Sequence, residues 1–194
     1  MAIKLVPGGH PSYSIAEASA NAASTGQVAP DEVETITLSR PCVTALTGPI
    51  PPSDLIDMAH SPACFLAAGV ADHGFSWLHA SEAKIKDPVI HQLIDKVRVG
   101  TPPTQQIDQY KQGATVTIRT KDGRTFSSTV YAPKGAGVLG IDWVDVDAKY
   151  RALVPPAQVH DQQVEESLQV IHDFHHVKHI SELTDLLQTH GEGG

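Results

Sequence analysis

The first strongly patterned segment is Ser12–Thr25, where small apolar residues recur at helical spacing. Gly26 follows it, and a glycine at this place commonly ends a helix in the left-handed conformation. The run Val33–Arg40 is rich in β-branched residues and alternates, which predicts a strand. Four prolines and one glycine between residues 41 and 53 predict a loop. A loop of this length in a compact domain is often functional.

Two helix starts come next, each with a capping residue followed by proline. Ser61-Pro62 opens an apolar segment that we expect to run to about Trp77. Asp87-Pro88 opens a shorter helix, and Val97–Val99 returns to strand character. The pattern therefore places helices between the first two strands.

A hairpin is the clearest local prediction. The segments Ala114–Thr120 and Arg124–Tyr131 alternate in the manner of strands and flank Lys121–Gly123. Asp-Gly supplies the positive φ that a tight turn requires. From Asp145 the pattern is helical, with one helix after Asp161 and a last short one capped by Ser181. The apolar face of the first of these contains Val164, Leu168, Ile171 and Phe174.

Helices, then strands, then helices predict an α+β fold with a small, mostly antiparallel sheet and flanking helices. We expect a domain over residues 1–154. Residues 155–194 are expected to form C-terminal helices that pack on this domain or on a partner.

The net charge of the chain disfavours some classes of binding partner. Lys and Arg number 14 against 22 Asp and Glu, giving a net charge of −8 and a pI of about 5.7. Such a field repels phosphate backbones and anionic lipids, which disfavours nucleic-acid and membrane partners. No stretch approaches the roughly 20 apolar residues of a membrane span. Pro7 and two glycines interrupt any signal-peptide core, so we expect a soluble, cytoplasmic protein with free thiols at Cys42 and Cys64.

Histidines cluster between residues 172 and 179. The pairs His172/His176 and His175/His179 have i,i+4 spacing, which on one helix face can share a metal ion. The segment lacks HExxH order, and the polar face of an amphipathic helix explains the same residues. We therefore predict no metal site.

Polar residues near the N-terminus and before the Ser61 helix are the stronger candidates for chemistry. A helix N-terminus favours anions, so His60 and Ser61 could hold a carboxylate, with Lys4 as a second cationic group. The alternative is that His60 only supports the structure and that Lys4 is a solvated terminus. The remaining candidates lie in the loop after Lys4: His10, Ser12 and Tyr13.

Short segments along nearly the whole chain form an ordered set: Ile3–His10, Pro30–Leu38, Ala59–Ser61, Ile85–Val89, Lys121–Gly123, Pro133–Gly135 and Ala148–Leu153. As a set they resemble the smaller, C-terminal "lid" domain of the MmgE/PrpD family, which includes 2-methylcitrate dehydratase and cis-aconitate decarboxylase. The resemblance implies the fold of that lid and a reaction that needs no cofactor. It also implies a large all-helical domain, found ahead of this region in full-length members, with the active site between the two.

The resemblance also implies roles for individual residues. Lys4 matches a family lysine, the loop from His10 to Tyr13 matches polar lid residues, and His60 matches a histidine of some relatives. A tyrosine used by the decarboxylase falls near Leu46, so decarboxylation of cis-aconitate is not expected.

The leading hypothesis is a lid-type subunit or domain of an MmgE/PrpD-like lyase or isomerase, most readily a dehydratase, acting on a small carboxylic acid. An all-helical partner protein or a homo-oligomer would complete its site. The expected catalytic residues are Lys4, His10 and His60, and the expected substrate-binding residues are Ser12, Tyr13 and Ser61. The alternatives are a non-catalytic binding or regulatory module that retains the lid fold, and a domain excised from a longer enzyme.

Overall fold

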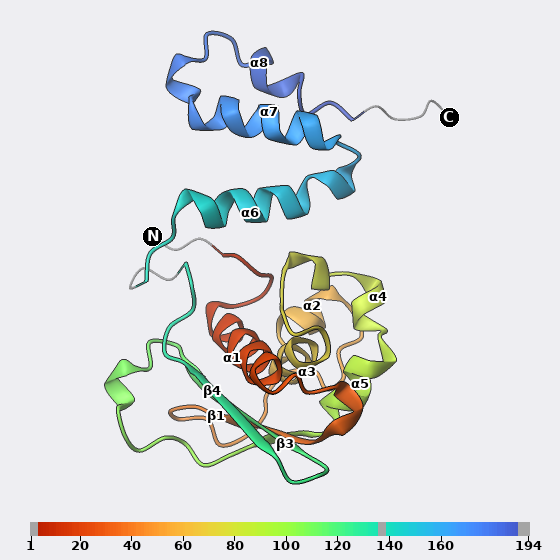
Figure 1. Ribbon diagram of the computed structural model, residues 1–194, viewed down its shortest axis with the longest axis vertical. Helices are drawn as coiled ribbons and strands as arrows, with labels where there is room; N and C mark the ends of the chain where they lie inside the picture. The colour runs from red at the N-terminus through yellow and green to blue at the C-terminus, as the bar shows by residue number, and fades with distance from the viewer. Residues whose placement is uncertain (1–3, 136–138, 190–194) are drawn as a thin grey trace. The chain divides into compact units, whose positions relative to one another are not determined.

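The computed structural model describes residues 4–135 and 139–189. The chain divides into two compact units, Met1–Ile141 and Asp142–Gly194 (Figure 1). The second unit begins with α6 (Trp143–Leu153), which is hydrogen-bonded to α7 (Asp161–His172). The hydroxyl groups of Tyr150 and Ser167 lie 2.9 Å apart, and Arg151 Nε donates to Glu165 over 2.6 Å.

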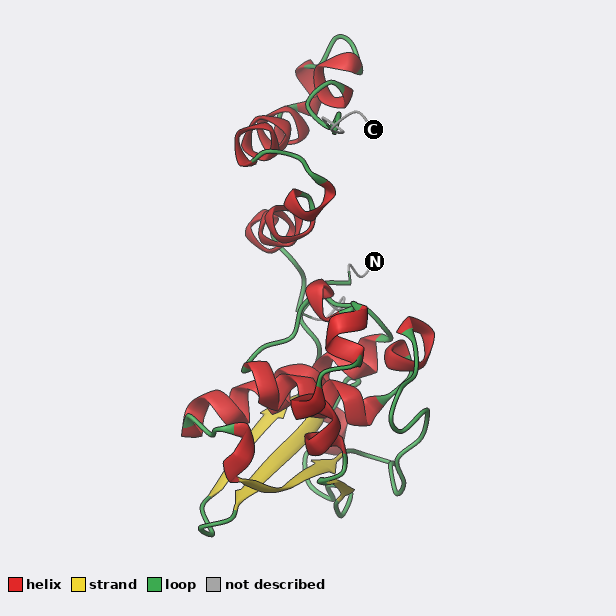
Figure 2. Cartoon of the chain, turned by 90° about the vertical axis from the view of Figure 1, so that its right-hand side faces the viewer, coloured by secondary structure: helices red, strands yellow, loops and turns green. Residues whose placement is uncertain are grey.

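The first unit contains a four-stranded sheet in the order β2-β1-β3-β4. Strand β1 (Val33–Ser39) pairs in parallel with β2 (Val97–Val99) and antiparallel with β3 (Ala114–Thr120). Strand β4 (Thr125–Val130) completes the predicted hairpin with β3. Helices lie over one face of the sheet (Figure 2). The expected α+β class with a small, mostly antiparallel sheet is confirmed.

The hairpin turn has the expected chemistry. Gly123 has a φ of +89°, which an L side chain would resist. The Asp122 carboxylate accepts hydrogen bonds from the Thr120 hydroxyl and from Arg124 Nε. These bonds, with the Thr120 hydroxyl contributing most, lower the pKa of Asp122 to about 2. The turn is therefore held by its own side chains.

Helix α1 (His10–Gly26) lies across β3 and β4 and packs against α3 (Pro62–Asp72). Gly69 permits the close approach of the two helices, because a Cβ there would lie 2.7 Å from the Ala16 carbonyl oxygen. The buried Ser19 hydroxyl donates to the Leu66 carbonyl over 2.6 Å. The largest fully buried side chains of this core include Phe65, Ile36, Leu38, Met58, Leu66, Ile90, Leu93 and Ile118.

Helix ends and short helices depart from the prediction. Helix α3 ends at Asp72 and not near Trp77, since His73 adopts a left-handed φ of 51°. The helices α2 (Leu55–Ala59) and α4 (Glu82–Ile85) were not expected, because one turn is too short to show periodicity. Helix α5 (Pro88–Ile94) is capped by Asp87 as predicted.

The second unit is helical, but two predictions about it are wrong. Helix α7 ends at His172, and Phe174–His176 form a separate 3-10 turn in which Phe174 is 50% exposed. Phe174 therefore does not extend the buried face made by Val164 and Leu168. In α8 (Ser181–Thr184), Ser181 is the first helical residue and not a side-chain cap. No helix in the described ranges is long and apolar enough to cross a membrane.

Candidate functional site

Three of the predicted site residues line one small hollow. Lys4, His10 and Tyr13 border it together with residues of the loop between them, and the space it encloses is too narrow to hold a water molecule. His10 and Tyr13 share a side of α1 because they are three residues apart in its first turn. Residues that carry an ammonium group, an imidazole and a phenol thus border one hollow. These groups bind carboxylates and transfer protons.

Glycine geometry holds the loop in this position. Gly8 has a φ of +85°, and a Cβ there would lie 2.7 Å from Phe65 Cζ and 3.0 Å from the Ala59 carbonyl oxygen. The loop therefore rests on α3 and on the residue that precedes His60. Pro11 lies in the first turn of α1, and the Ser12 N–H donates to the Gly9 carbonyl over 3.0 Å.

His60 and Ser61 have different environments. His60 is exposed and ends α2. Ser61 is fully buried, and its hydroxyl accepts a hydrogen bond from the Cys64 N–H at 3.4 Å, capping α3. Gly48, with a φ of +85°, packs so closely on the His60 carbonyl that no side chain fits there. His60, Ser12 and Ser61 are not among the residues that line the hollow of Lys4.

Glu17 is a residue that sequence reasoning missed. It lies seven positions after His10 and so returns to the same side of α1. Burial raises the pKa of its carboxyl group, and the neighbouring Lys134 lowers it by less. Within the described residues, its buried Oε2 has no hydrogen-bond partner. In the sequence, Glu17 stands out only as a lone acidic residue in an Ala-rich helix. Its burial cannot be inferred from the sequence.

A second hollow, of about 80 Å³, lies where β1 ends. Arg40 lines it, and burial lowers the pKa of the Arg40 guanidinium. Leu46, near which the family's decarboxylase tyrosine was placed, also lines it. Nothing in the local sequence pattern distinguishes Arg40 from a solvated arginine.

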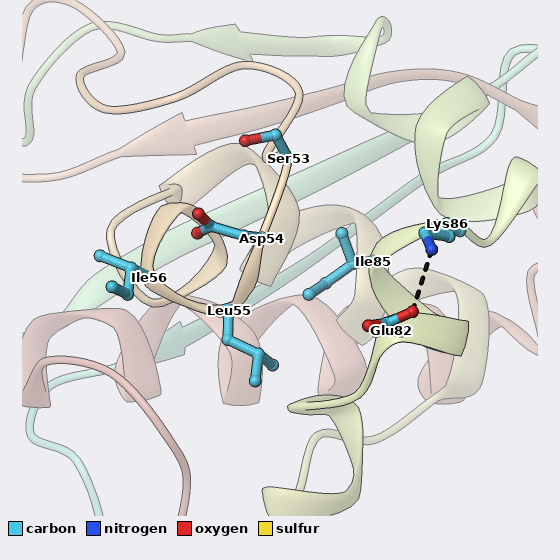
Figure 3. A pocket seen from close by; sticks show the side chains of 7 residues that line it. All are labelled: Ser53, Asp54, Leu55, Ile56, Glu82, Ile85 and Lys86. Atoms are coloured by element: carbon cyan, nitrogen blue, oxygen red, sulfur yellow. Dashed lines mark hydrogen bonds and ion pairs between the residues drawn. The ribbon is translucent and has the colours of Figure 1, made fainter.

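A cavity of about 400 Å³ lies between α2 and α4 and contains none of the predicted residues (Figure 3). Its polar side chains are engaged with each other or with their own helices. Asp54 accepts from the Asp57 N–H over 2.8 Å, and Lys86 pairs with Glu82 over 3.0 Å. The remaining wall is apolar, so this cavity offers surface for contact more than groups for catalysis.

The histidine-rich segment does not form the i,i+4 pairs, because α7 ends at its first histidine. His172 Nε2 instead lies 3.0 Å from Asp147 Oδ1. The ligand atoms of Asp173, His175 and His176 lie within 4.8 Å of one another, and all three residues are exposed. The structure thus brings together a different set of possible ligands from the one considered in sequence.

Both cysteines are free, and they differ in exposure. Cys64 is buried in α3, and burial raises the pKa of its thiol to about 11. The thiol is therefore protonated at neutral pH. Cys42 is exposed in the proline-rich loop.

Residues 7–173 match the family model of the MmgE/PrpD C-terminal domain. The chain belongs to the MmgE/PrpD family. The matched region contains His10, Tyr13, His60 and Arg40, whereas Lys4 precedes it. A comparison with curated proteins finds no match. Membership in the MmgE/PrpD family identifies the fold as that of a lid-type domain of dehydratase-like enzymes.

Proposed function

We propose that this MmgE/PrpD chain is the lid-type half of a lyase, most readily a dehydratase, that acts on a small hydroxylated carboxylic acid. An all-helical domain carried by a partner protein completes the site, and a homo-oligomer is the second possible assembly. The observation that carries the proposal is the meeting of Lys4, His10 and Tyr13 at one hollow in a chain of this family. The free thiols of Cys42 and Cys64 agree with the cytoplasmic location that we propose for it.

The proposed roles follow from the chemistry of water loss. A base removes the proton α to a carboxylate, the C=C bond forms, and the C–O bond breaks as an acid protonates the departing hydroxyl group. Lys4 neutralises a substrate carboxylate and the enolate-like charge that develops on it. His10 or His60 transfers the proton, because an imidazole titrates near neutral pH.

The remaining residues position or contact the acid. Ser12 and Tyr13 offer hydroxyl groups at the start of α1. Ser61 is buried and caps α3, so we assign it the role of fixing His60 in place. The reaction as proposed uses no cofactor.

The test begins with native mass spectrometry of the chain purified gently from its source. A complex with an all-helical protein is then assayed for water loss from small hydroxy acids. We expect Lys4→Ala and His10→Ala each to lower kcat/KM by about 100-fold or more. Lys121→Ala, which changes an exposed lysine of the hairpin turn, is the matched control and keeps full activity.

Two results contradict the proposal. If the complex with Lys4→Ala keeps full activity, Lys4 does not neutralise the substrate carboxylate. If His10→Ala and His60→Ala both keep full activity, neither histidine transfers the proton. Stable assemblies that bind small acids without converting them would identify the chain as the binding module considered above.

A further inference from the structure

Arg40 is an unusual cation in this protein. It follows β1 and lines the 80 Å³ hollow with side chains from α1, from β1, from the loop over residues 41–53 and from the start of α3. Thr47 is the one other polar residue in this lining. The apolar lining residues are Ile15, Leu38, Val43, Ala45, Leu46 and Pro62.

The side chains of the other four arginines all have an ion-pair or hydrogen-bond partner. Arg119 Nε lies 2.8 Å from Glu34, Arg124 pairs with Glu32 and Asp122, and Arg151 pairs with Glu165. The remaining one, Arg98, donates to backbone carbonyl groups over 2.7 Å. Within residues 4–135 and 139–189, the Arg40 guanidinium has neither a carboxylate within ion-pair distance nor a hydrogen-bond acceptor.

This arrangement leaves a charge partly removed from water without a compensating anion. Burying an unpaired charge costs free energy, and the cost is reflected in the lowered pKa of Arg40. The chain has 22 acidic residues, so the absence of an acidic partner is not due to a shortage of them. A small anion in the hollow would supply the missing partner.

The hollow fits one kind of anion best. The planar fork of a guanidinium matches the two oxygens of a carboxylate. About 80 Å³ accommodates a group of a few heavy atoms, since one water needs roughly 10–15 Å³ by this measure. The apolar wall suits a hydrocarbon attached to the carboxylate and not a fully hydrated phosphate. We infer that Arg40 and this hollow form a subsite for one carboxylate of a small organic acid.

The assignment of that acid as the substrate rests on the proposed function, whereas the subsite itself does not. Of the lining residues, Thr47 adjoins Gly48, which packs on the His60 carbonyl group. On the proposed function, Arg40 binds a carboxylate of the acid on which His10 or His60 acts. It would distinguish acids with a carboxylate at this position from acids that lack one.

A titration of the full chain with propionate, followed through the Arg40 Nε–H resonance in NMR, tests the subsite. We expect a saturable shift with propionate and none with propionamide, its neutral isostere. Arg40→Met should weaken propionate binding by roughly tenfold or more. Arg119→Met, which removes an exposed arginine paired with Glu34, is the matched control and should bind propionate as the wild type does.

Stability provides a second readout. Since the Arg40 side chain makes no ion pair or hydrogen bond with the described residues, Arg40→Met should have a Tm equal to or above that of the wild type. A clear fall in Tm would show that Arg40 serves the fold, and would overturn the inference. The inference also fails if propionamide shifts the resonance as propionate does, if no saturable shift occurs, or if inorganic phosphate binds more tightly than propionate. These last three outcomes need only the wild-type chain.

The two proposals fail separately. If Arg40→Met loses propionate binding while Lys4→Ala and His10→Ala keep full activity, the subsite is supported and the proposed reaction is rejected. If the complex does not bind propionate but loses activity with Lys4→Ala, the reaction is supported and the subsite is rejected.

Discussion

Glu17 shows how a single buried carboxyl group connects the fold to pH. Burial raises its pKa above the ordinary value of 4.5, so the folded chain binds this proton more tightly than the unfolded chain does. The associated stability is fully present below about pH 4.5 and is lost as the pH rises through the folded pKa. Glu17 in its ionised form therefore weakens the fold at neutral pH.

Glu17→Gln should raise the Tm at pH 8 by about 1–2 °C, after allowing for the solvent that still screens this half-buried group. At pH 4 the difference should disappear, because the carboxyl group is then protonated. Thermal unfolding followed by circular dichroism at both pH values measures it. A Glu17→Gln variant that is less stable than the wild type at pH 8 would show that the attraction of Lys134 outweighs burial.

Alanine substitutions at Gly48 and Gly123 distinguish the cost of backbone strain from the cost of steric contact. Both have positive φ, at +85° and +89°, but a Cβ on Gly48 would meet the His60 carbonyl, whereas Gly123 has open space. Gly123→Ala should cost about 1–2 kcal/mol through φ alone. Gly48→Ala should cost about 1–3 kcal/mol more, because the loop must move away from His60. Urea unfolding compares the two variants, and equal costs would mean that the contact with His60 is not tight.

At the scale of elements, packing between α1 and α3 reverses an intrinsic preference. Alanine normally stabilises a helix interior relative to glycine by about 1 kcal/mol. At position 69, however, the new methyl group would lie 2.7 Å from the Ala16 carbonyl oxygen and 2.9 Å from Ser19 Cβ. Neither the backbone nor the neighbouring Cβ can yield without separating the helices.

Gly69→Ala should therefore destabilise the chain by about 1–3 kcal/mol in urea unfolding. Gly74→Ala is the control, since its Cβ would lie 3.8 Å from the Asp72 carbonyl oxygen, an ordinary contact. We expect the control to be within about 0.5 kcal/mol of the wild type. A stabilised Gly69→Ala variant would show that the two helices can separate at little cost.

At the scale of the whole chain, the two units differ in the cores that hold them. The core of the first unit joins α1, α3 and α5 to the strands. That of the second consists of Val159, Val164 and Leu168, with Tyr150 and Val154 packed against them. A small core protects its backbone hydrogen bonds less well, because local opening exposes little apolar surface.

Hydrogen exchange should therefore be at least about tenfold faster in α6 and α7 than in α1, α3 and β3. Mass spectrometry of peptides from the 194-residue chain measures this difference directly. Adding the helical partner of the proposed assembly should not change the ranking of exchange rates among the elements of the first unit. Equal protection in both units would mean that the second unit has support beyond its own core.

Local chemistry sufficed to determine many of the elements. Asp-Gly placed the β3–β4 turn, Ser61-Pro62 and Asp87-Pro88 placed the starts of α3 and α5, and β-branched alternation placed β1. The ordered set of short segments was enough to recognise the MmgE/PrpD family from sequence. In each case the residues that carry the information lie within a few positions of the element they determine, so no knowledge of distant contacts is needed.

Tertiary structure decided which of the polar residues have functional surroundings. Because α7 ends at His172, the i,i+4 histidine pairs do not share one helix, and the buried Ser61 hydroxyl caps α3. Burial alone also distinguished Glu17 and Arg40 from solvated side chains. The free energy of a charged group depends on the water and counter-charges that surround it, and these come from segments far away in the sequence. A linear pattern records which groups are present, whereas only the fold determines their partners.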